Sequence, residues 1–108
     1  MRSDKEKVGI ACGENSEILF TFDSIYNIHK IVARGIIDDD WDAKTGRKSQ
    51  IYSSGNGNTW TKVGKIPKNF GKVNVIIPLS RNNSKYIKIT TNYNSRLGIG
   101  FIEFYTEK

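Results

Sequence analysis

The stretch that decides the fold reads Gln50-Ile51-Tyr52-Ser53-Ser54-Gly55-Asn56-Gly57-Asn58-Thr59-Trp60-Thr61-Lys62-Val63-Gly64. Two short segments of strand-forming residues flank a turn of glycine and asparagine. The Asn-Gly pair at residues 56–57 supplies the positive φ angles that a tight hairpin turn requires. We therefore predict that residues 51–53 and 59–61 are the paired strands of a β-hairpin.

The same kind of pattern extends over the rest of the chain. Apolar residues alternate with others at residues 18–22, 73–77 and 87–91, as they do when one face of a strand packs on a core. Residues 28–36 are nearly all apolar, which predicts a central strand that is covered on both faces. With a strand at residues 7–12 the pattern gives about eight short strands and predicts an all-β, jelly-roll-like antiparallel β-sandwich.

Size and composition predict one globular domain over residues 1–108, because 37% of the side chains are hydrophobic and 26% are charged. The apolar runs are too short for a membrane span, and the first residues lack the apolar core of a secretory signal. Cys12 is the single cysteine, so an internal disulfide is excluded. These features leave the localisation open between the cytoplasm, a virion and a module excised from a longer protein. Without an export signal, we interpret the glycosylation sequon at residues 82–84 as a chance match.

The net charge of +6 draws the chain toward anionic partners. The lysines are scattered along the chain rather than clustered, so a solvated surface is favoured over a nucleic-acid interface. We also expect a basic edge that discourages edge-to-edge aggregation of the sheet. Its members are Lys62, Lys65, Lys68, Lys72, Lys85 and Lys88.

Patterns that support catalysis or metal binding are missing from the sequence. One histidine, His29, and one cysteine cannot form a zinc site, and no nucleophile is tied to His29. The glycines at residues 55–57 precede a predicted strand, whereas a dinucleotide-binding loop opens a helix. The acidic run at residues 38–42 lacks the spacing of a calcium-binding loop. We therefore predict no catalytic site, no metal and no cofactor.

Four stretches resemble the discoidin or coagulation-factor type C family, which has the galactose-binding-like fold. Residues 52–60 resemble its tyrosine, serine, glycine turn and tryptophan, and residues 17–32 resemble a strand pair that leads to "Ile-x-Lys-Ile". Residues 85–89 resemble its "Arg-Tyr-Ile-Arg-Ile" strand, and residues 100–105 its terminal "Glu-Phe-Tyr" strand. The four occur in the family order. Residues 1–14 lack the family's "Asp-Gly-Asn, Thr-x-Trp" stretch, so its calcium site is not carried over.

The resemblance implies a non-catalytic binding module that recognises a carbohydrate through loops at one end of the sandwich, and it implies that Trp60 packs into the core. The loops at that end would be residues 38–47 and 92–97. An aromatic ring there can stack on the apolar face of a sugar, while charged and amide side chains hold its hydroxyls. The predicted ligand-binding residues are Asp40, Trp41, Arg47, Tyr93, Asn94 and Arg96.

A second hypothesis is a structural or protein-interaction domain, as a component of a multiprotein assembly, an oligomer, or a phage or viral particle. A fold does not dictate its function, and a sandwich can also serve as a docking platform. The two hypotheses differ in their partner, which is a glycan in the first and a protein in the second.

Overall fold

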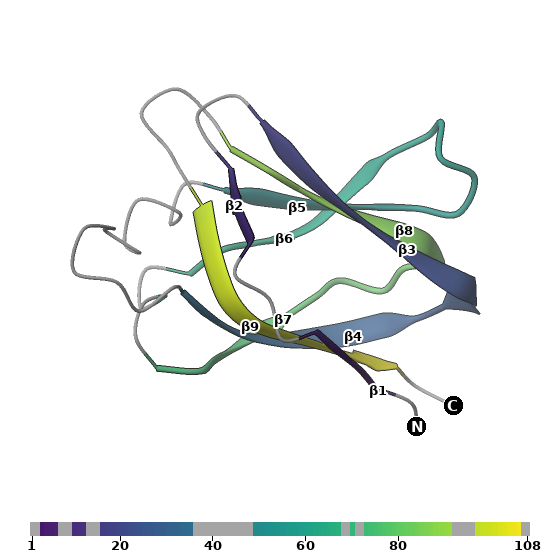
Figure 1. The fold of residues 1–108 in the computed structure, drawn as a ribbon. Helices are drawn as coiled ribbons and strands as arrows, with labels where there is room; N and C mark the ends of the chain where they lie inside the picture. The colour runs from purple at the N-terminus through teal and green to yellow at the C-terminus, as the bar shows by residue number, and fades with distance from the viewer. Residues whose placement is uncertain are drawn as a thin grey trace.

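The computed structural model describes residues 3–6, 10–12, 16–35, 49–67, 70, 73–91 and 97–106. Over these ranges the chain forms nine strands, arranged in two antiparallel sheets that face each other (Figure 1). The predicted all-β sandwich is therefore confirmed. No helix in the described part of the chain is long and apolar enough to cross a membrane.

The first sheet has five strands in the order β1-β9-β4-β7, with β2 also beside β9. Their bounds are β1 Ser3–Glu6, β2 Ile10–Cys12, β4 Ile28–Gly35, β7 Val75–Pro78 and β9 Leu97–Thr106. Because β4 lies between β9 and β7, the prediction of a central strand at residues 28–36 is confirmed, but only one of its faces is buried and the other is half-buried. The strand β1 was not predicted, because its sequence Ser-Asp-Lys-Glu contains no apolar residue. It forms by pairing with residues 102–105 of β9, a contact that local sequence does not encode.

The second sheet has four strands in the order β3-β8-β5-β6. Their bounds are β3 Glu17–Tyr26, β5 Gln50–Ser54, β6 Thr61–Lys65 and β8 Ser84–Thr90. Ser53 pairs with Thr61, so the predicted hairpin is confirmed, but its connection runs through residues 55–60 and is not a tight two-residue turn. Gly57 has φ of 83°, the positive value that the Asn-Gly pair predicted.

The core lies between the two sheets and is built chiefly from isoleucine and phenylalanine. Phe104 of β9 is 2% exposed, and its ring meets Phe20 and Phe22 of β3 edge-on, with centroid distances of 4.9 Å and 5.2 Å. Such edge-to-face contacts add to the free energy gained by burying the rings. Phe104 thus joins the first sheet to the second, and we call Phe20, Phe22 and Phe104 the aromatic triad.

The predicted basic edge is right in part. Lys62 and Lys65 are exposed on β6, which is an edge strand. Lys85 and Lys88 lie on β8 between β3 and β5, so the prediction is wrong for them. Lys68 and Lys72 are outside the described residues.

The first prediction concerns the aromatic triad. Phe104→Ala should lower the free energy of unfolding by about 3–5 kcal/mol, because it removes a buried ring and leaves a cavity between the sheets. Urea denaturation followed by circular dichroism measures this loss. Phe101→Ala on the same strand is the matched control and should cost clearly less, since that ring is only half-buried. Equal losses in the two variants would contradict the register of β9.

Candidate functional site

The six residues predicted to bind a ligand lie in two segments outside the described residues. Asp40, Trp41 and Arg47 fall within residues 36–48. Tyr93, Asn94 and Arg96 fall within residues 92–96. Their role therefore stays a prediction, and what the structure supplies is the position of the strand ends that flank both segments.

Those strand ends lie together at one end of the sandwich. β4 ends at Gly35, which is paired with Ile99 near the start of β9. β5 begins at Gln50, which is paired with Thr90 at the end of β8. Both segments are thus attached at the same end of the molecule (Figure 1). We call it the anchor end, defined by Gly35, Gln50, Thr90 and Ile99.

Hydrogen bonds between distant parts of the chain hold the anchor end in place. The backbone N–H of Ser16 donates to Oγ1 of Thr91 at 2.9 Å, and the backbone N–H of Thr91 donates to the carbonyl oxygen of Ser16 at 2.8 Å. The N–H of Ile66 donates to the carbonyl oxygen of Ser49 at 3.0 Å. The segments at residues 36–48 and 92–96 therefore start from fixed points.

Buried polar atoms without a hydrogen-bond partner among the described residues occur near the anchor end. Examples are Nε of Arg34, which precedes Gly35, and Oγ of Ser49, which precedes Gln50. Unpaired buried polar atoms are uncommon in folded proteins and call for an explanation, of which a functional role is one. The guanidinium carbon of Arg34 lies 5.8 Å from the centroid of the Phe101 ring, a cation–π contact on the outer face of the first sheet.

Trp60 does not pack into the core, so that prediction is wrong. It is half-buried on the outer face of the second sheet, where its ring centroid lies 6.4 Å from that of Tyr86. Nζ of Lys88 lies 4.1 Å from the centroid of the Trp60 ring and 5.9 Å from that of Tyr52. The physical reason is that Trp60 precedes β6 in the connection from β5, and so it is free of the strand's alternation.

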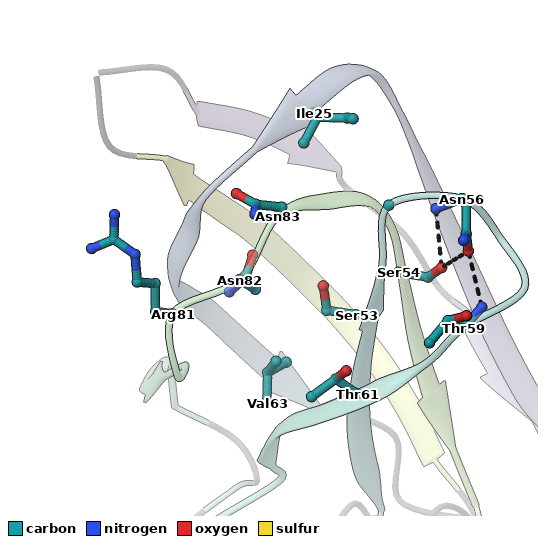
Figure 2. A pocket seen from close by; sticks show the side chains of 11 residues that line it. Ile25, Ser53, Ser54, Asn56, Thr59, Thr61, Val63, Arg81, Asn82 and Asn83 are labelled. Carbon is teal, nitrogen blue, oxygen red and sulfur yellow. Dashed lines mark hydrogen bonds between the residues drawn. The ribbon is translucent and has the colours of Figure 1, made fainter.

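The opposite end of the sandwich carries a polar structure that the sequence did not predict. In the β5–β6 connection, Oγ of Ser54 accepts hydrogen bonds from the N–H of Gly57 at 2.8 Å and of Asn56 at 3.2 Å. Oδ1 of Asn56 accepts from the N–H of Asn58 at 2.8 Å. It also accepts from the N–H of Thr59 at 2.9 Å (Figure 2). These side chains replace the backbone bonds of a tight turn and give the longer connection one defined shape.

Asn82, in the connection from β7 to β8, joins three parts of the same end. Its Oδ1 accepts from the N–H of Ile28 at 3.0 Å and from Oγ of Ser84 at 2.6 Å. Its Nδ2 donates to the carbonyl oxygens of Ile28 at 2.9 Å and Ser80 at 2.8 Å. The side-chain amide has no further hydrogen-bonding capacity and is buried, which agrees with the interpretation of its sequon as a chance match.

The second prediction tests this amide. Asn82→Ala should lower the free energy of unfolding by about 2–4 kcal/mol, because it leaves buried backbone groups of Ile28 without partners. Asn83→Ala is the matched control, and it should change stability by less than about 0.5 kcal/mol because Asn83 is exposed. Thermal and urea unfolding of both variants measure the difference. A loss in Asn82→Ala no larger than that of its neighbour would contradict the role of this amide.

The third prediction concerns Gly57. Gly57→Ala should destabilise the fold by about 1–2 kcal/mol, because an alanine is strained at positive φ. A Cβ atom itself would fit, since it would lie 3.4 Å from Cε2 of Tyr86. Gly57→Asn should therefore cost less than Gly57→Ala, because asparagine tolerates this backbone conformation. Urea titration of the two variants compares them, and the reverse order would show that space rather than conformation limits this position.

The described residues contain no group of three or more His, Cys, Asp or Glu side chains that could hold a metal ion. The acidic run at residues 38–42 lies outside them. The chemistry that these residues do offer is hydrogen bonding by hydroxyl and amide groups, together with exposed cations.

The fold is that of solved carbohydrate-binding modules and lectin domains, in agreement with the resemblance read from the sequence. CpGH89CBM32-5 from Clostridium perfringens, in complex with GalNAc-β-1,3-galactose, superposes with a TM-score of 0.69 at 11% identity, covering 86% of this chain and 68% of its own. The C-terminal domain of a chitobiase from Bacteroides fragilis superposes with a TM-score of 0.70 at 13% identity. The match covers 84% of this chain and 62% of the chitobiase chain. The lectin domain of lectinolysin, complexed with Lewis B antigen, superposes with a TM-score of 0.67 at 12% identity. The match covers 98% of this chain and 72% of the lectin chain.

At these identities the likeness establishes the fold alone. The chain spans less than two thirds of the chitobiase domain and about two thirds of the CBM32-5 module. No family model matches the sequence. No curated protein matches it either.

Proposed function

We propose that the chain is a non-catalytic carbohydrate-binding module that engages a glycan at the anchor end. The observation that carries this proposal is the shared sandwich: the solved structures that superpose on this chain include a CBM32 module in complex with GalNAc-β-1,3-galactose and a lectin domain complexed with Lewis B antigen. The proposal is supported by the strand pairing, which places the strand ends flanking residues 36–48 and 92–96 at one end of the sandwich.

The residues proposed to bind the glycan are those that the sequence singled out. Trp41 or Tyr93 would stack on the apolar face of a sugar ring, a contact that aromatic side chains make well. Asp40, Arg47 and the pair Asn94 and Arg96 would accept from and donate to the sugar hydroxyls. Fixed strand ends favour such a site, because anchored loops lose less conformational freedom on binding.

The proposal is also that the chain itself catalyses no reaction. CBM32 modules are non-catalytic, although the chitobiase domain and other neighbours are parts of larger enzymes. His29 is half-buried on β4, and its Nδ1 has no hydrogen-bond partner among the described residues. It therefore lacks, in that part of the chain, the orienting partner that a general base normally has.

A second candidate function is protein interaction within an assembly, and the first sheet offers the observation that favours it. Ile76 on the edge strand β7 is 65% exposed, and Val73 just before the strand is 68% exposed. Exposed apolar side chains beside an edge strand are a common feature of protein contacts. This candidate predicts self-association or a protein partner and no affinity for sugars.

The fourth prediction separates the two. A glycan array probed with the purified chain should show selective binding, and Trp41→Ala should abolish it while circular dichroism stays unchanged. Trp60→Phe is the matched control: it alters the chain's other tryptophan, on the outer face of the second sheet, and should retain binding. An array without binding from a folded chain would overturn the carbohydrate proposal, and analytical ultracentrifugation would then test for assembly.

A further inference from the structure

A pocket of about 480 Å³ lies at the end of the sandwich opposite the anchor end. It sits where β3 and β5 end and β6 and β8 begin, since Tyr26 pairs with Ser84 and Ser53 pairs with Thr61. Its size falls within the range of roughly 300–1,000 Å³ that is typical of small-ligand pockets. Figure 2 shows its walls: the β5–β6 connection on one side and residues 81–83 on the other.

Both walls are held in shape without a ligand. The Ser54 and Asn56 side chains fix the β5–β6 connection through four bonds to its backbone N–H groups. Asn82 fixes the other wall by its bonds to Ile28 and Ser80, and its own N–H donates to Oδ1 of Asn27 at 3.1 Å. A pocket whose walls are already ordered binds with a smaller loss of conformational entropy.

The groups left over after these structural bonds define what the pocket can recognise. The side chains of Thr59, Thr61 and Asn83 make no hydrogen bond with the described residues, so their hydroxyl and amide groups are available. Arg81 is exposed, has no ion-pair partner there, and is the only charged residue among those that line the pocket. Ile25 is 55% exposed and adds an apolar surface at the rim.

We propose that this pocket binds an acidic sugar, a ring that carries both hydroxyl groups and a carboxylate. Thr59, Thr61 and Asn83 match the ring hydroxyls, and Ile25 matches an apolar ring face. The Arg81 guanidinium matches the carboxylate, because its planar fork can donate two parallel hydrogen bonds. A neutral sugar would leave Arg81 unused, and a simple carboxylic acid would leave the hydroxyl and amide groups unused.

Arg81 can reach a ligand from its place at the rim. Figure 2 shows its guanidinium turned away from the centre of the pocket, toward solvent. Exposed side chains change rotamer within nanoseconds, so an anion in the pocket can draw the guanidinium over it. The lining contains no carboxylate that would compete for Arg81, and the net charge of +6 attracts anions to the chain.

Titration of the ¹⁵N-labelled chain with methyl β-D-glucuronide tests the proposal. The backbone amide signals of Gly55, Thr59 and Asn83 should shift, and methyl β-D-glucoside, which lacks the carboxylate, should bind at least about tenfold more weakly. A parallel titration with the methyl glycoside of N-acetylneuraminic acid distinguishes a uronic acid from a sialic acid as the acidic sugar. Tighter binding of either acid than of the glucoside supports the pocket.

Three variants complete the test. Arg81→Ala should weaken binding of the acidic sugar about tenfold or more, whereas Lys62→Ala, which removes the same charge from an exposed position on β6 outside the pocket, should leave it unchanged. Trp41→Ala should also leave it unchanged, so a failure at this pocket is distinguishable from a failure at the anchor end. The proposal is overturned if neither acid shifts these amides, if the glucoside binds as tightly, or if Arg81→Ala retains full affinity.

Discussion

The pairing of β9 is the constraint on which the rest of the structure depends. This strand of the C-terminal region pairs with β4 along one side and with both β1 and β2 along the other. Its Phe104 also provides the contact by which the first sheet meets β3 of the second. Because β1 and β2 come from the first residues of the chain, the first sheet cannot be completed until the last strand is in place. Strand pairings between residues that are far apart in the sequence form slowly, because the entropy of closing the long loop is lost before the contacts are gained.

The same pairings give the two ends of the sandwich different characters. At the anchor end, the ends of β4 and β8 and the starts of β5 and β9 lie together, and hydrogen bonds such as the two between Ser16 and Thr91 fix the chain there. At the opposite end, the connections are short and their backbone is held by the side chains of Ser54, Asn56 and Asn82. The side chains of Thr59, Thr61 and Asn83 take no part in these bonds, which is why the pocket at this end has hydroxyl and amide groups available beside its apolar lining.

The sequence predicted the features that depend on local periodicity. The buried face of β8, with Ile87 and Ile89 turned inward, follows directly from alternation. For β4 the apolar run predicted the central position, whereas the alternation of Ile31 and Ala33 with half-buried neighbours appeared only in the structure. The strand β1 could not be predicted, because its pairing depends on β9, and β9 lies at the far end of the sequence. The structural role of Asn82 could not be predicted either, because an asparagine in a polar turn gives the same sequence pattern whether its amide is buried or exposed to solvent. Trp60 was assigned to the core by resemblance alone, and the length of the β5–β6 connection placed it on the surface instead.

The two proposed sites, taken together, constrain how the chain would act on a glycan. They lie at opposite ends of the sandwich, on either side of its buried core, so one short saccharide cannot occupy both. A polysaccharide or a glycan-coated surface can present several residues at once, and binding at one end then raises the effective concentration for the other. Arg81 is assigned to a carboxylate, whereas Asp40, Arg47 and Arg96 are assigned to sugar hydroxyls, so screening by salt acts more strongly on the pocket than on the anchor end. Under both proposals the chain would favour acidic, repetitive glycans over isolated neutral sugars. The preference for repetition arises from the separation of the two sites, and the preference for acidity arises from Arg81.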